Sequence, residues 1–60
     1  GALKDYDAFL KLQPQDNGGL YERALVKFNM RDTAGACSDW SLAAQYGNET
    51  ATANIKQFFH

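Results

Sequence analysis

A short segment near the start of this 60-residue chain recurs 34 residues later, and this repeat limits the possible folds more than any other feature. Residues 1–6 and 35–40 share a glycine, an alanine, an aspartate and a large aromatic residue in the same order. The matched pairs are Gly1 and Gly35, Ala2 and Ala36, Asp5 and Asp39, and Tyr6 and Trp40. A fixed period of about 20–50 residues is typical of proteins whose units bury their apolar faces against one another. The chain is therefore predicted to contain related units that stack.

The apolar residues within each copy have helical spacing. They are Ala2, Leu3, Tyr6, Phe9 and Leu10 in the first copy, and Ala36, Cys37, Trp40, Ala43 and Ala44 in the second. Positions i, i+1, i+4, i+7 and i+8 lie on one side of an α-helix. Each copy is predicted to form an amphipathic helix.

Turn-forming residues separate these two helices from a helix between them. Pro14 cannot continue a helix and disfavours the helical conformation at the residue before it, so the first helix should end near Leu12. The second helix should run from about residue 18 to residue 30, with Asp16 or Asn17 as its N-cap. Adjacent glycines at 18 and 19 lower helix propensity, which leaves open a start as late as Leu20.

The third and fourth helices have similar signals at their ends. Asp32 or Thr33 can cap the third helix, which should continue to about residue 46. Gly47 then suits the left-handed position that follows a helix, and Asn48 can cap a last helix through about Phe59. The apolar residues of this last helix also have helical spacing: Ala51, Ile55, Phe58 and Phe59. The predicted fold class is all-α, with about four helices joined by short connections.

The spacing of these residues resembles the tetratricopeptide repeat, a 34-residue helix pair whose pattern ends in alanine, a later aromatic residue and a proline. The matching residues are Ala2, Tyr6 and Pro14 in one copy and Ala36 and Trp40 in the next, where Asn48 replaces the proline. Ala24 takes the small position usually held by glycine. Leu20 stands near the frequent tryptophan, and Lys27 occupies the place of a consensus tyrosine. The segment 43–51 is also similar to the helix junction of Sel1-like repeats, a related helix-pair family.

This resemblance implies a fragment of a solenoid built from antiparallel helix pairs. Residues 1–13 would be the second helix of a truncated repeat, residues 17–47 one complete repeat, and residues 48–60 a C-terminal capping helix. In such repeats the first helix of each pair lines a concave groove that binds a peptide or protein. The resemblance places four residues on or beside that groove: Tyr21, Leu25, Phe28 and Asn29. Tyr21 and Leu25 stand where a clamp for acidic C-terminal peptides needs Lys and Asn, so such a ligand is not favoured.

Composition and charge disfavour several other functions. The formal net charge is −1, which gives no electrostatic footprint for nucleic acid. No segment approaches the run of about 18 apolar residues that a membrane-spanning helix requires, so we expect no membrane partner. The single cysteine, Cys37, has no second thiol for a disulfide or a metal pair and is interpreted as a small buried apolar residue. Neither a metal nor another cofactor is predicted.

No set of residues indicates catalysis. Asp5 and Asp39 recur at equivalent places, and we expect both on a solvated outer face rather than paired at a substrate. His60, the only histidine, ends the chain, where a positioned general base is not expected. The sequence therefore predicts a protein that is not an enzyme.

Two uses of a helical-repeat scaffold remain. The first is a module for protein–protein interaction that binds a peptide or protein partner in the groove. The second is a structural cap or self-association segment of a longer repeat protein. A short stack should leave apolar residues of the first helix uncovered, and a homo-oligomer could form through that face: Tyr6, Phe9 and Leu10.

Overall fold

The computed structural model describes residues 2–59, and over this range it contains four α-helices. They are α1 (Ala2–Leu12), α2 (Asn17–Asn29), α3 (Thr33–Gln45) and α4 (Glu49–Phe58). The all-α class is confirmed, and the predicted helix ends agree with the observed ones to within about one residue. The alternative late start of the second helix is wrong, because α2 begins at Asn17 despite its two glycines. Gly1, the first residue of the predicted first segment, and His60, the last residue of the predicted last segment, lie outside the described residues.

A short polar side chain caps the N-terminus of each of the last three helices. Each side chain accepts a hydrogen bond from the backbone N–H three residues further on, and the pairs are Asp16 with Gly19, Asp32 with Gly35 and Asn48 with Ala51. These bonds satisfy amide groups that have no partner inside the helix. The sequence allowed Asp16 or Asn17 to cap α2 and Asp32 or Thr33 to cap α3. In both helices the aspartate is the N-cap.

The helices end in different ways. Gly47 has a φ of 102°, so the left-handed conformation predicted after α3 is confirmed. The turn between α2 and α3 uses a left-handed residue as well, but there it is Arg31, with a φ of 66°. Nothing in the sequence pattern indicated this, because arginine has no special preference for that region.

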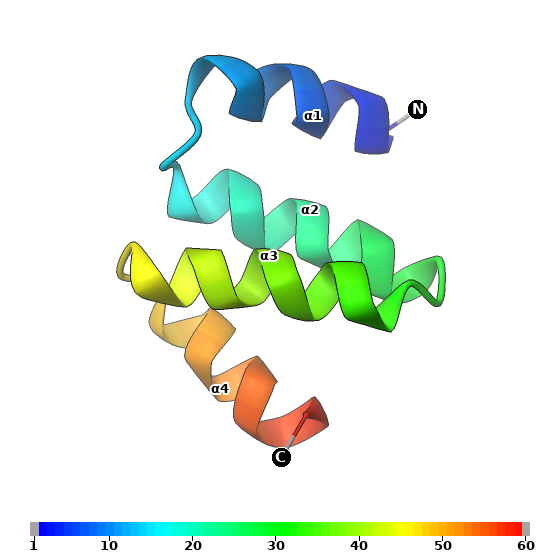
Figure 1. Ribbon diagram of the computed structural model, residues 1–60, viewed down its shortest axis with the longest axis vertical. Helices are drawn as coiled ribbons and strands as arrows, with labels where there is room; N and C mark the ends of the chain where they lie inside the picture. Colours follow the sequence, from blue (N-terminus) through cyan, green and yellow to red (C-terminus); the bar gives the residue numbers. More distant parts are fainter. Residues whose placement is uncertain (1, 60) are drawn as a thin grey trace.

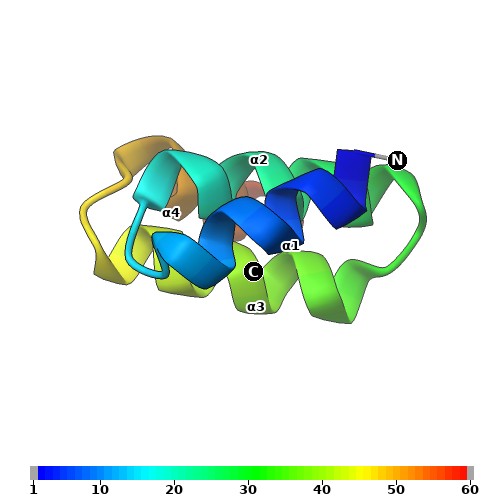
Figure 2. The same cartoon turned by 90° about the horizontal axis from the view of Figure 1, so that it is seen from above.

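The helices pack in chain order, α1 on α2, α2 on α3 and α3 on α4 (Figure 1). Successive helices run in opposite directions, and α4 is inclined to the other three. Viewed from above, α1, α2 and α3 extend along a common axis (Figure 2). The most extensive contact is between α2 and α3. The molecule is flat, with extents of 30 × 24 × 13 Å.

Small residues let these helices approach closely. The buried core consists of Leu10, Leu20, Ala24, Ala36, Trp40, Ala43 and Ala51. Four of the seven are alanines, and Trp40 is the one aromatic residue among them. Trp40 has no exposed surface, and it is the largest fully buried side chain.

Two predictions about burial are wrong. Leu10 is only 5% exposed because it packs into the core, so it does not belong to an uncovered face of α1. Cys37 is half-buried rather than buried. Tyr6 is half-buried and Phe9 is 44% exposed, so these two residues do retain accessible surface.

A polar contact ties the start of α2 to the turn between α3 and α4. The Asn17 side-chain amide donates to the Tyr46 carbonyl at 3.1 Å, and Asn48 donates to the Asn17 side-chain oxygen at 3.2 Å. Asn48 thus caps α4 and contacts α2 at the same time. This contact fixes α4 relative to α2, although the two helices are separated in the chain by α3.

Candidate interaction surface

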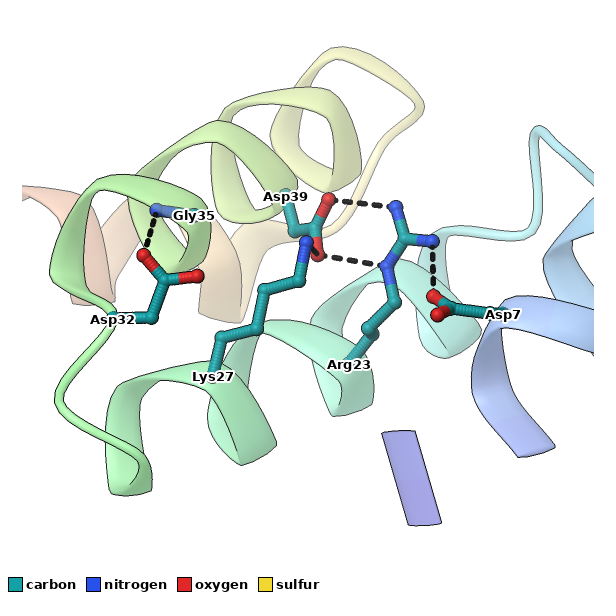
Figure 3. Close-up of polar contacts among 6 residues, drawn as sticks. All are labelled: Asp7, Arg23, Lys27, Asp32, Gly35 and Asp39. Atoms are coloured by element: carbon teal, nitrogen blue, oxygen red, sulfur yellow. Dashed lines mark hydrogen bonds and ion pairs between the residues drawn. The ribbon is translucent and has the colours of Figure 1, made fainter. Parts of the chain in front are cut away.

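A charged cluster lies between α2 and α3. Asp39 is only 3% exposed, and both of its carboxylate oxygens accept hydrogen bonds from Arg23, Oδ2 from Nε and Oδ1 from Nη2, each at 2.8 Å (Figure 3). Lys27 adds a third contact, with its Nζ 3.1 Å from Oδ2 of Asp39. Arg23 and Lys27 are four residues apart, which places both on one face of α2. The bidentate geometry is the strongest form of arginine–carboxylate pairing.

Arg23 also contacts α1. Its Nη1 donates to Oδ1 of Asp7 at 2.9 Å, so one guanidinium joins three successive helices (Figure 3). The two ends of this chain differ in environment, because the Asp7 side chain is 55% exposed whereas that of Asp39 is 4% exposed. Water therefore screens the pair with Asp7 more strongly than the pair with Asp39.

The ionised form of the cluster is favoured. Burial by itself raises the pKa of Asp39, but the hydrogen bonds from Arg23 and Lys27 outweigh burial and hold the pKa below its ordinary value. The hydrogen bond to Asp39 raises the pKa of Arg23, although burial opposes it. Asp39 is thus a buried carboxylate that stays charged at neutral pH.

An aromatic cluster surrounds Trp40. Its partners come from two helices and the end of the chain: Tyr21 at a ring-centroid distance of 6.4 Å, Phe28 at 5.4 Å, Phe58 at 6.0 Å and Phe59 at 5.9 Å. Such distances are typical of favourable aromatic pairs. Within residues 2–59 the buried indole N–H of Trp40 has no hydrogen-bond partner. The cluster is therefore held by apolar contact.

Three of the four predicted groove residues belong to this region. Tyr21, Leu25 and Phe28 are half-buried and pack against the core. The Tyr21 hydroxyl accepts a hydrogen bond from the Asn54 side chain of α4 at 3.1 Å. The ring centroids of Phe28 and Phe58, which belongs to α4, lie 5.0 Å apart. The fourth residue, Asn29, is exposed at the last position of α2. One edge of α2 thus lies beside α4, and we call Tyr21, Leu25, Phe28, Asn29 and Phe58 the α2/α4 surface.

The expectation that Asp39 lies on a solvated outer face is wrong. Asp39 is three residues after Ala36 and four before Ala43, so it lies on the apolar stripe of α3 and is buried with it. That spacing was available in the sequence, as was the i, i+4 pair of cations, Arg23 and Lys27, on the preceding helix. These positions, together with Asp7, form a charged cluster that the sequence pattern did not predict. Asp5 is exposed, as expected.

Comparison with known proteins provides no further identification: no family model, curated protein or solved structure matches this chain. Within residues 2–59, no helix is long and apolar enough to cross a membrane. The same part of the chain has no group of three or more His, Cys, Asp or Glu side chains placed to hold a metal ion, and no pocket.

Proposed function

We propose that this chain is a non-catalytic interaction module, similar to a tetratricopeptide repeat, that binds a peptide or protein partner. The proposal is supported by the 34-residue repeat in the sequence and by four antiparallel helices that pack in chain order. In such a module α2 and α3 form the complete repeat, and α4 is the capping helix.

The observation that carries the proposal is the position of Phe58. The centroid of its ring lies 5.0 Å from that of Phe28 and 6.0 Å from that of Trp40, yet Phe58 keeps 46% of its surface exposed. An aromatic side chain that is both anchored and accessible can provide contact area without losing much conformational freedom. Tyr21 and Asn29 add polar groups along the same edge of α2. The α2/α4 surface therefore has the composition of a binding site for an apolar peptide.

The test is a selection of peptides from a random displayed library on the immobilised chain, followed by titration of one synthesised peptide into the ¹⁵N-labelled protein. We expect saturable shifts of the amide signals of the α2/α4 surface. We also expect Phe58→Ala to weaken binding at least about fivefold, equivalent to about 1 kcal/mol. Leu42→Ala is the matched control, because Leu42 is 36% exposed on α3. Shifts confined to other helices, or equal effects of the two variants, would contradict the proposal.

A structural cap or self-association segment is the second candidate, and the exposed apolar residues of α1 favour it. Phe9 is 44% exposed and Leu12 is 79% exposed, and residues three apart are neighbours on a helix surface. If two copies associate through this helix, light scattering should give a mass that rises with concentration, and Phe9→Ser should abolish the rise. A constant monomer mass at all concentrations would exclude self-association.

A further inference from the structure

The two sequence copies differ in what covers them. The buried residues of α3 are Ala36, Asp39, Trp40 and Ala43, and their equivalents 34 residues earlier are Ala2, Asp5, Tyr6 and Phe9. Every member of the α3 set is at most 3% exposed. In the α1 set Tyr6 is half-buried, and the other three residues are exposed. One sequence pattern thus forms a buried face in α3 and an exposed face in α1. We call the four residues of this exposed face, Ala2, Asp5, Tyr6 and Phe9, the α1 open face.

Helix α2 explains the difference. It packs against α3 with Ala24, which has no exposed surface, and with Arg23 and Lys27, which both contact Asp39. A small residue lets the helices approach, while the two cations neutralise a carboxylate that would be costly to bury alone. Asp39 is therefore compatible with a buried stripe only because the facing helix supplies these cations.

The contact of α1 with α2 uses mainly a different side of α1. Leu10 is buried there, and Asp7 accepts a hydrogen bond from Arg23. Leu3, Tyr6, Asp7 and Leu10 lie on one side of the helix, and Ala2, Asp5 and Phe9 lie on the adjacent side. Tyr6 lies at the boundary of the two sides, which agrees with its partial burial. Phe9 also touches α2, because two of its ring carbons lie 2.9 and 3.1 Å from the position of a Cβ added at Gly19. The remainder of the α1 open face, Ala2 and Asp5, is exposed although α1 is packed on α2.

Asp5 makes no ion pair with any residue in the range 2–59. It stands between Ala2 and Phe9 as Asp39 stands between Ala36 and Ala43. An apolar face with one carboxylate at its edge is complementary to a helix that has an apolar edge and two cations one turn apart. A helix with apolar residues alone would bury Asp5 without a partner.

We propose that the α1 open face is a docking site for an antiparallel helix that carries an arginine and a lysine at i and i+4 with a small residue beside the arginine. The arginine and the lysine pair with Asp5 as Arg23 and Lys27 pair with Asp39, and the small residue packs near Tyr6. This site is distinct from the α2/α4 surface, so the proposal does not depend on peptide binding there.

The test extends the chain with a copy of its own residues 16–34, placed directly before Gly1. This register keeps the separation of 16 residues that joins Arg23 to Asp39, now between the copied arginine and Asp5. Urea unfolding followed by circular dichroism gives the equilibrium constant for unfolding. In the extended chain we expect Asp5→Asn to raise this constant at least about tenfold, because it removes charge-assisted hydrogen bonds from a buried site. In the 60-residue chain the same change should alter it less than about threefold.

A charge exchange separates specific pairing from a general effect of added length. Changing the copies of Arg23 and Lys27 to glutamate should destabilise the extended chain, and adding Asp5→Lys should restore at least part of the loss. Glu22→Gln is the matched control, because it removes one exposed carboxylate that has no ion pair in the range 2–59.

Equal effects of Asp5→Asn in the two chains would overturn the proposal, as would a charge exchange without recovery. A third contradictory result is a dimer of the 60-residue chain in light scattering that dissociates on Asp5→Lys. That result would show that a second copy occupies the face instead.

Discussion

Helices α1 and α3 contain the same short sequence pattern, but they occupy different environments. Trp40 and Asp39 are buried in α3, whereas Tyr6 is half-buried and Asp5 is exposed in α1. The difference comes from neighbours, because α3 is covered by both α2 and α4 and α1 contacts chiefly α2. A repeated sequence pattern therefore specifies which face of a helix is suited to burial, while the adjacent helices decide whether that face is buried.

The largest expected effect is on the aromatic centre. Trp40→Ala removes the only large side chain that is fully buried within residues 2–59, and we expect a loss of about 3–5 kcal/mol. A chain of this length has a total stability of only about 3–9 kcal/mol, at about 0.05–0.15 kcal/mol per residue, so the variant should be largely unfolded. Circular dichroism during thermal unfolding measures this.

The equivalent change in α1, Tyr6→Ala, is the control for that prediction. Tyr6 is only half-buried, so we expect a loss of about 1–2 kcal/mol. Equal losses at the two positions would mean that α1 is packed as completely as α3.

The next largest effect concerns the two equivalent aspartates. Asp39→Asn leaves Arg23 and Lys27 facing a neutral group in a buried site, and we expect a loss of about 3 kcal/mol. Asp5→Asn changes an exposed residue without an ion pair in the range 2–59 and should cost less than about 0.5 kcal/mol. Urea unfolding followed by Trp40 fluorescence gives both values. A difference below about 1 kcal/mol would contradict the burial contrast.

These contrasts show why sequence reasoning succeeds at helix ends. The caps Asp16, Asp32 and Asn48 act over three residues, and Pro14 and Gly47 act through their own backbone. Such local effects are encoded in local sequence, so the four helices follow from it. Arg31 is the exception, because its left-handed conformation is imposed by the turn that joins two packed helices.

The site depends on contacts between residues far apart in the chain. Arg23 reaches Asp39 and Asp7, each 16 residues away, and the pairing requires the helices to be placed first. From the sequence, Asp39 resembled Asp5 and was assigned to solvent with it. Asp39 can be buried because Arg23 and Lys27 of α2 face it, and this contact depends on how the two helices pack. The predicted groove residues Tyr21 and Phe28 were assigned from a family resemblance, and their role in binding stays a prediction.

Acid should weaken the buried pairing of Asp39 with Arg23 and Lys27. The pKa of Asp39 is lowered in the folded chain, because hydrogen bonds from Arg23 and Lys27 outweigh burial. Its contribution to stability is therefore complete above the unfolded pKa of about 3.9 and is lost as the pH falls through the lower folded pKa. We expect a decrease in the free energy of unfolding below about pH 4, measured by urea titration at a series of pH values. Asp39→Asn should reduce this decrease.

The ends of the two helices provide a smaller test. α3 is followed by Gly47 with a φ of 102°, a conformation that side chains disfavour, whereas α1 is followed by a turn that contains Pro14. No atom stands within 4 Å of the position of an added Cβ at Gly47, so Gly47→Ala should be limited by backbone strain alone. We expect a loss of about 1–2 kcal/mol in thermal unfolding. Gln15→Ala, in the turn after α1, is the control and should be nearly neutral.

The smallest effect is expected at the exposed end of the charged cluster. Asp7 accepts one hydrogen bond from Arg23 at 2.9 Å, but its side chain is 55% exposed, so Asp7→Asn should cost between about 0 and 1 kcal/mol. The loss should shrink further in high salt, because exposed pairs are screened, whereas the loss from Asp39→Asn should change little. The double variant, Asp7→Asn with Asp39→Asn, tests whether the two aspartates contribute independently. If their contributions are coupled through Arg23, the two losses of stability will not add. Additive losses would mean that α1 is attached to the α2 and α3 pair without altering the buried contact, as its open face suggests.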